Sequence, residues 1–212
     1  MGLKERKERE RQEMRGTILK SAYRLFVDKG FDDVSIRNVA EAIEYSPATI
    51  YLYFKDKNEI IHALHRQGFS LLNKLFQPLF KINNPFDRLC EMGRAYIKFA
   101  IKNSEMYKLL FIRSEPMEHL ASCQNQDWDE GDRAFDALVQ TVAQCQQLGY
   151  FKNLDTHQFS MTIWSFIHGL CALRLSGHLG RVKEERESNK KLDQIMDETL
   201  KTFTLAIEKL KK

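Results

Sequence analysis

The stretch from residue 34 to residue 58, VSIRNVAEAIEYSPATIYLYFKDKN, constrains the fold more than any other part of the chain. Its pattern predicts a short amphipathic helix, a tight turn and a second short helix. Ser35 can cap the first helix. Ser46 with Pro47 can open the second, because proline at the first helical position gives up no hydrogen bond. The second helix carries small, hydroxyl and aromatic side chains. This is typical of a helix-turn-helix whose second helix enters a DNA groove.

Apolar residues around this stretch repeat at three- and four-residue spacing, which predicts a small core shared by three helices. Gly30 suits the end of the first helix in a left-handed conformation, and Phe31 can fold back on that helix. The predicted core residues are Ile18, Leu19, Ala22, Leu25 and Phe26 in the first helix, Ile36, Val39, Ala40 and Ile43 in the second, and Ile50 and Phe54 in the third.

Residues 3–15 form a run of charges with few apolar side chains. Two interpretations are open. The run is either a solvated helix extension or frayed arm, or an arm whose Lys and Arg side chains reach DNA phosphates or a minor groove. Residues 1–58 hold twelve Lys and Arg against ten Asp and Glu, a net charge of only +2. Any phosphate-binding surface must therefore be a local arrangement.

The remaining chain also has helical periodicity and no clear two-residue alternation, so we predict an all-α fold of about nine helices. We expect an N-terminal domain at residues 1–58 and a larger helical domain at residues 59–212. Residues 116–126 are predicted to form a loop, and residues 180–189 a charged link between the last two long helices, 156–179 and 190–210.

The composition argues against several other classes of protein. No apolar run approaches the ~18 residues of a membrane span, and the N-terminus lacks the apolar core of a secretory signal. We therefore expect a cytoplasmic protein with no membrane partner. The chain has no nucleophile elbow, phosphate loop or paired acid and base spacing, so an enzyme is not expected.

Metal and disulfide chemistry also have weak support. His62 and His65 share a helix face, as do the acidic residues and histidine at 115–119, but neither set has a convincing further ligand. We expect no metal and no other cofactor. The cysteines are far apart and form no CxxC, so buried free thiols are the favoured interpretation and a redox sensor is the alternative. They are Cys90, Cys123, Cys145 and Cys171.

Residues 15–67 resemble the N-terminal DNA-binding domain of TetR-type transcriptional regulators through a specific joint spacing. The matching residues are Ile18-Leu19, Ala22, Leu25-Phe26, Gly30-Phe31, Val39-Ala40, Ser46, Thr49-Ile50-Tyr51, Tyr53-Phe54 and Lys57. Further along, Trp164 with His168-Gly169 is similar to the Trp…His-Gly pattern of one regulatory-domain subgroup, and Tyr96 with Phe99-Ala100 fits that subgroup too. The resemblance implies a helix-turn-helix DNA-binding domain followed by a ligand-binding and dimerisation domain.

One position departs from the family pattern. The turn between the second and third helices usually carries glycine, and this chain has Glu44 there. A non-glycine residue in a left-handed turn costs roughly 1 kcal/mol. We expect either a strained turn or a slightly different placement of the third helix.

The resemblance implies that the third helix lies in the major groove. Arg37 is then the candidate for a paired hydrogen bond to guanine O6 and N7, with a phosphate contact as the alternative. Pro47 and Ala48 can contact thymine methyl groups, and hydroxyl and cationic side chains can anchor phosphates. The predicted DNA-binding residues are Ser35, Arg37, Ser46, Pro47, Ala48, Thr49, Tyr51, Tyr53 and Lys57.

Lys57 stands at the start of the fourth helix, where a cation opposes the helix dipole. A bound phosphate would reverse that penalty, because helix N-termini attract anions. Asp56 and Glu59 have the spacing of a capping box around it.

The resemblance also implies a homodimer on a palindromic double-stranded DNA operator, because one such domain makes too few contacts for tight specific binding. The expected interface is the last two long helices, 156–179 and 190–210, which would form a four-helix bundle with their symmetry mates. Packing of these helices within their own chain is the alternative.

TetR-type regulators usually sense a small molecule in the C-terminal domain. Aromatic and methionine side chains suit an apolar or aromatic effector, although side chains at such spacing also serve as core. The candidate ligand-binding residues are Met92, Tyr96, Phe99, Met106, Tyr107, Phe111, Trp128, Met161, Trp164 and His168. We thus predict a repressor that a ligand releases from DNA. The alternatives are an interaction protein that no longer binds DNA, and a redox-responsive regulator.

Overall fold

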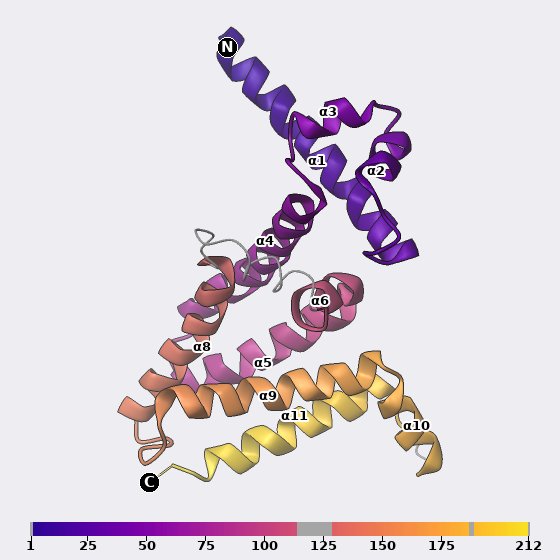
Figure 1. The fold of residues 1–212 in the computed structure, drawn as a ribbon. Helices are drawn as coiled ribbons and strands as arrows, with labels where there is room; N and C mark the ends of the chain where they lie inside the picture. Colours follow the sequence, from indigo (N-terminus) through magenta and orange to yellow (C-terminus); the bar gives the residue numbers. More distant parts are fainter. Residues whose placement is uncertain (1, 114–128, 187–188, 212) are drawn as a thin grey trace. The chain divides into compact units, whose positions relative to one another are not determined.

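A computed structural model of the chain describes residues 2–113, 129–186 and 189–211 (Figure 1). These residues hold ten α-helices and one 3₁₀ helix, and their only strand-like pairing is the isolated bridge between Tyr150 and Lys211. The all-α prediction is confirmed, with slightly more helices than expected. The predicted loop at residues 116–126 lies outside the described residues. Within the described part, no helix is both long and apolar enough to cross a membrane.

The described residues fall into two compact units. The N-terminal unit contains the chain up to Gly68 and the residues from Leu109 to Arg113. The C-terminal unit contains Phe69–Lys108 and the described residues from 129 onward. The division passes through α4 (Lys57–Phe76), between Gly68 and Phe69. A domain boundary at residue 58 stays a prediction.

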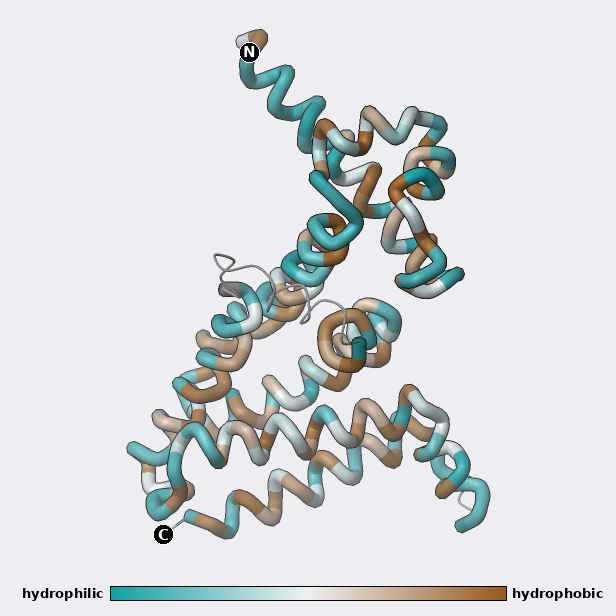
Figure 2. Tube along the Cα trace, in the orientation of Figure 1, coloured by the Kyte–Doolittle hydropathy of each residue, from teal (hydrophilic) through white to brown (hydrophobic). Residues whose placement is uncertain are grey.

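The N-terminal unit is built from α1 (Leu3–Lys29), α2 (Ile36–Ala42), α3 (Pro47–Tyr51) and the start of α4. The first turns of α1 are mostly hydrophilic (Figure 2), and Leu3 at their start is an exposed apolar residue. The predicted core of this unit is confirmed except at Leu25 and Ile43, which are only half-buried. Its buried side chains are Ile18, Leu19, Ala22, Phe26, Ile36, Val39, Ala40, Ile50 and Phe54, joined by Phe31, Val34, Ile60, Ile61 and Leu64.

The end of α1 depends on Gly30. Its φ of 85° and ψ of 167° lie in a region that is essentially restricted to glycine. Its N–H donates to the carbonyl oxygen of Phe26 at 3.0 Å. This turn brings Phe31 back onto the helix, where its ring stacks on Phe26 with centroids 4.7 Å apart, as the sequence predicts.

The C-terminal unit is centred on α5 (Pro85–Lys102), which packs against α8 (Asp129–Gln147), α9 (Thr156–Leu175) and α11 (Leu192–Glu208). Two further short helices belong to it, η1 (Gln77–Lys81) and most of α6 (Ser104–Phe111). Asp155 caps α9 by accepting from the N–H of Gln158 at 2.9 Å. Gly93 permits the close packing of α5, because a Cβ there would meet Ile167 Cδ1 at 3.2 Å.

The predicted charged link between the last two long helices is wrong. α9 ends at Leu175, and a left-handed Gly177 (φ 84°) starts another helix, α10 (His178–Glu185). The charges in this segment support helix formation rather than solvated coil, because they pair at helical spacing. Arg181 Nε lies 3.1 Å from a Glu185 carboxylate oxygen four residues later.

Candidate functional sites

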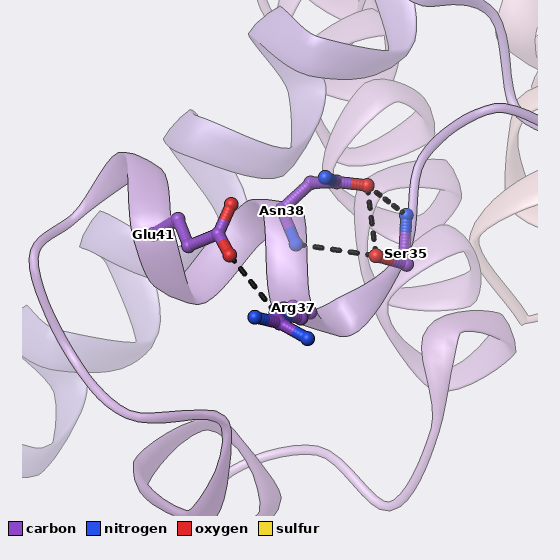
Figure 3. A network of polar contacts seen from close by, with 4 residues as sticks. All are labelled: Ser35, Arg37, Asn38 and Glu41. Carbon is purple, nitrogen blue, oxygen red and sulfur yellow. Dashed lines mark hydrogen bonds and ion pairs between the residues drawn. The ribbon is translucent and has the colours of Figure 1, made fainter.

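The start of α2 is fixed by a reciprocal cap between Ser35 and Asn38 (Figure 3). The N–H of Asn38 donates to Ser35 Oγ at 3.2 Å, and the N–H of Ser35 donates to Asn38 Oδ1 at 2.8 Å. The Ser35 side chain is nevertheless exposed. The cap therefore sets the direction of α2 and leaves the serine at the surface, where a phosphate can reach it.

Arg37 projects from α2 and is 80% exposed. Its Nε donates to a Glu41 carboxylate oxygen at 3.0 Å, one helical turn away (Figure 3). A surface pair of this kind contributes only about 0.3–0.5 kcal/mol. The guanidinium is therefore held on the outer face of α2 by an interaction weak enough to be exchanged for a DNA contact.

The turn before α3 is strained at Glu44, as the missing glycine predicts. Glu44 has a φ of 60°, and the next residue, Tyr45, donates its N–H to the carbonyl oxygen of Ala40 at 2.9 Å. Ser46 then caps α3 by accepting from the N–H of Thr49 at 3.3 Å, and Pro47 occupies the first turn. The turn keeps its tight geometry and carries the strain.

α3 has only five residues, and it brings most of the predicted DNA-binding side chains together. Pro47, Ala48 and Tyr51 are exposed, with Tyr51 at 57%, while Thr49 and Tyr53 are half-buried. The sequence interpretation missed Leu52, whose side chain is 73% exposed directly after α3. Leu52 lies between the buried Ile50 and Phe54, so its sequence neighbourhood does not distinguish it from a core residue.

Lys57 has a partner within the protein. Its Nζ donates to the carbonyl oxygen of Phe31 at 2.8 Å, which ties the first residue of α4 to the start of the α1–α2 link. The capping box around it is displaced by one residue. Asp56 accepts from the N–H of Glu59 at 2.8 Å, but the Glu59 carboxylate accepts from the N–H of Lys55 at 2.6 Å instead of from Asp56.

Like Lys57, Arg15 links two segments of this unit through its side chain, and the sequence interpretation missed it. Its Nη1 donates to the carbonyl oxygen of Tyr53 at 2.7 Å, and its guanidinium lies 4.0 Å from the centroid of the Phe54 ring. Nη2 lies 3.9 Å from a Glu59 carboxylate oxygen. Arg15 thereby fixes α1 against the end of α3. Its partners are 38 or more residues away, so no local pattern reveals it.

In the C-terminal unit, four of the predicted ligand-binding residues form one polar cluster. The indole N–H of Trp164 donates to the hydroxyl oxygen of Tyr96 at 3.1 Å. The Tyr107 hydroxyl lies 2.7 Å from His168 Nδ1, and the Tyr96 hydroxyl lies 3.4 Å from the same nitrogen. The Tyr96 and Tyr107 rings meet edge to face with centroids 5.9 Å apart. We call these four residues the Tyr–His cluster.

Burial fixes the protonation states of the Tyr–His cluster. Burial raises the pKa of Tyr96 and of Tyr107 above the usual tyrosine range and lowers the pKa of His168. At neutral pH both tyrosines are therefore hydroxyl donors and the imidazole is neutral. A neutral imidazole carries one proton, and the direction of its 2.7 Å hydrogen bond with the Tyr107 hydroxyl follows from which ring nitrogen holds that proton.

The other predicted ligand-binding residues have mixed surroundings. Met92 and Phe99 are buried, and the Thr141 hydroxyl donates to the Met92 sulfur at 3.4 Å. Met106 is half-buried, whereas Met161 is 44% exposed. Phe111 is half-buried and belongs to the other unit, and Trp128 lies outside the described residues.

An open groove of about 510 Å³ lies along α4, η1 and α8. Its lining is largely polar. None of the predicted ligand-binding residues within the described ranges lines it. The lining residues are Ser70, Asn73, Lys74, Phe76, Gln77, Phe80, Glu130, Arg133, Asp136, Ala137 and Gln140.

The helices predicted to dimerise have both buried and exposed apolar residues. On α11, Met196, Leu200 and Ile207 are buried within the chain. Leu173 on α9 and Leu205 on α11 are 49% and 50% exposed.

The cysteines within the described ranges are poor candidates for thiolate chemistry. Burial raises the pKa of Cys90 to about 11 and those of Cys145 and Cys171 to about 12. These thiols are protonated at neutral pH, and the thiolate is the reactive form. Cys123 lies outside the described residues. Within those ranges no group of three or more His, Cys, Asp or Glu residues is arranged to hold a metal ion.

Comparison with known families agrees with the two-part architecture. The family model for bacterial regulatory proteins of the tetR family matches residues 18–64. The model for the tetracyclin repressor-like C-terminal domain matches residues 89–198, just over half of the chain. This chain belongs to the TetR family. It is therefore a DNA-binding transcriptional regulator, and its family is not one of enzymes.

Several individual proteins are similar to this TetR-family chain. The transcriptional activator FasR of Mycolicibacterium smegmatis is 29% identical over 102 residues, which cover 48% of this chain and about half, 47%, of FasR. The regulator AcrR of Shigella flexneri is 24% identical over 168 residues, covering 76% of this chain and 78% of AcrR. The structure of the fatty acid degradation regulator FadR from Bacillus halodurans has a TM-score of 0.67 and 14% identity, covering 88% of this chain and 92% of FadR. The structural likeness concerns the fold.

Proposed function

We propose that this TetR-family regulator is a repressor that binds a palindromic operator as a homodimer and dissociates when a small apolar or aromatic molecule binds its C-terminal unit. The observation that carries the proposal is the Tyr–His cluster. Two buried hydroxyls and a neutral imidazole in an apolar setting can fix the orientation of a ligand through a few convergent polar groups. FadR is a fatty acid degradation regulator, which supports an apolar ligand class for this chain.

Operator recognition rests on the exposed faces of α2 and α3. A bidentate contact between Arg37 and guanine supplies about 1–3 kcal/mol of discrimination, more than the surface pair with Glu41 contributes. The exposed Tyr51 hydroxyl and the half-buried Thr49 hydroxyl anchor phosphates, which fixes the register of α3 in the groove. Because α3 carries few long polar side chains, part of the specificity comes from methyl contacts and DNA shape.

Dimerisation uses the exposed apolar side chains of α9 and α11, among them Leu173 and Leu205. Two DNA-binding units then face half-sites one helical turn apart, roughly 34 Å. Ligand binding releases DNA only if the ligand prefers a conformation whose two α3 helices no longer match that spacing.

A transcriptional activator is the second candidate, because FasR, with 29% identity over part of the chain, is named as one. The sign of regulation depends on where the operator lies relative to a promoter, so contacts within the chain do not distinguish the two.

The test starts from duplexes that the wild-type protein selects from a random library. Fluorescence anisotropy of the labelled duplex gives the operator affinity. Naphthalene, decanoate and 4-hydroxybenzoate serve as ligand probes. Their binding is followed by Trp164 fluorescence in the Trp128→Phe variant, which has no other tryptophan. We expect an apolar probe to quench Trp164 and weaken operator binding together. Quenching without any change in operator affinity contradicts ligand-controlled release. In vitro transcription with the selected site placed over a promoter separates repression from activation.

A further inference from the structure

The first turns of α1 extend beyond the core of the N-terminal unit. Residues 3–13 are all exposed, and the first buried side chain of α1 is Ile18. We call residues 3–15 the extension. A helical segment without packing is marginal in water, so its own side chains must contribute to its stability. Figure 2 shows the extension as mostly hydrophilic, and its apolar residues are Leu3 and Met14.

Every carboxylate of the extension has a partner on the same helix. Glu5 accepts from the N–H of Gly2 at 2.9 Å, and Glu8 accepts from the Gln12 amide at 2.8 Å. The other two carboxylates form ion pairs four residues apart, Arg6 with Glu10 at 2.8 Å and Arg9 with Glu13 at 3.7 Å. All four carboxylates are thus hydrogen-bonded or ion-paired within the extension and its N-cap, and two of them use Arg6 and Arg9 as partners.

Three cations of the extension differ from the paired Arg6 and Arg9. Lys4, Lys7 and Arg11 have no ion pair or side-chain hydrogen bond with any described residue. Their positions, i, i+3 and i+7, place them on one face of the helix. Arg6 and Arg9, which are paired, lie on the opposite face. We call Lys4, Lys7 and Arg11 the cation stripe.

Arg15 shows which way the cation stripe faces. It follows Arg11 by four residues and therefore continues the same face of α1. Its guanidinium contacts the Tyr53 carbonyl oxygen and the Phe54 ring, directly after α3. The cation stripe consequently lies on the side of α1 that is turned toward the end of the recognition helix.

We propose that the cation stripe binds the DNA backbone beside the half-site that α3 reads. The helix rises about 10 Å over the seven steps from Lys4 to Arg11. One DNA strand carries about three phosphates over that axial length, which matches the three cations. A membrane surface fits less well, because interfacial helices need an apolar face that the extension lacks.

The experiment compares two variants with equal loss of charge on the same helix. The stripe variant is Lys7→Gln with Arg11→Gln, and the matched control is Arg6→Gln with Arg9→Gln. Glutamine keeps the helix propensity of both segments, and circular dichroism checks it. Each protein is titrated with a selected operator in two lengths, one ending at the half-site edges and one extending about ten base pairs further on each side.

The stripe variant is expected to lose at least tenfold in affinity for the long duplex and less than threefold for the short one. Its salt slope on the long duplex falls by about two units per protomer, because roughly 0.9 counterion is released for each phosphate contact. The control loses less than threefold on both duplexes. Equal losses for the two variants, no loss for either, or the same loss on both duplexes would overturn the proposal. The proposal rests on operator binding, which the wild-type titration tests separately.

Discussion

The two candidate sites differ in how their side chains are held. In the N-terminal unit, most of the groups proposed to touch DNA are exposed, and several are joined to near neighbours, as in the pair of Arg37 with Glu41 and the cap of Ser46 on Thr49. In the C-terminal unit, the Tyr–His cluster is joined across 61–72 residues of sequence and largely buried. The exposed site has interactions that a partner can replace. The buried site has protonation states that its surroundings fix.

The largest effect is expected from Tyr107→Phe in the buried site. The change removes the hydroxyl that lies 2.7 Å from His168 Nδ1, and the loss of such a buried hydrogen bond costs about 1 kcal/mol or more. Urea unfolding should show this loss, and the affinity for an apolar ligand should fall at least tenfold while operator affinity is kept. Tyr150→Phe is the control, because its hydroxyl accepts only a 3.4 Å contact from Lys211. Equal effects of the two changes would show that the cluster has no special role.

Lys57→Met separates the structural role of this lysine from phosphate binding. Loss of the charged hydrogen bond to the Phe31 carbonyl should reduce the free energy of unfolding by about 1.5 kcal/mol. Lys55→Met, an exposed neighbour, should change it by less than about 0.5 kcal/mol. The opposite result is that Lys57→Met leaves stability unchanged and only lowers the salt slope of DNA binding by about one. Phosphate binding, as expected from the sequence, would then be the only role of Lys57.

Glu44→Gly should stabilise the N-terminal unit. Glycine relieves the left-handed strain, a gain of about 1 kcal/mol that the greater freedom of glycine in the unfolded chain partly offsets. Thermal unfolding with and without operator measures the effect. A lower melting temperature would mean that the Glu44 side chain makes a compensating contribution.

The smallest effect concerns pH. Because burial lowers the pKa of His168, the folded protein resists protonation there while the unfolded chain takes up a proton below about pH 6.5. The contribution of His168 to the free energy of unfolding is thus fully present above about pH 6.5. It is lost as the pH falls toward the lower pKa that His168 has in the folded protein. Between pH 7.5 and 5.5, the wild type should lose more stability than His168→Asn. His157→Asn, an exposed residue of α9, should follow the wild type.

The sequence predicted the DNA-binding unit well because its signals are local. Caps at Ser35 and Ser46, the glycine at residue 30 and the strained turn at Glu44 all lie within a few residues of their partners. Arg15 was missed because its contacts are distant in sequence. The partner of Lys57 was missed for the same reason, since the Phe31 carbonyl is 26 residues away. In the C-terminal unit, the residue types of the Tyr–His cluster were predicted, but only the packing of α5, α6 and α9 shows that Tyr96, Tyr107, Trp164 and His168 meet.

Base selection by Arg37→Ala tests the central claim most directly. The claim is that the exposed faces of α2 and α3 read the operator. Wild-type and variant proteins select duplexes from the same random library, with Glu41→Gln as a control that frees the arginine. The account predicts that Arg37→Ala relaxes the preference for guanine at one position of each half-site, whereas Glu41→Gln keeps it. Unchanged base preferences for Arg37→Ala at every position would contradict the account.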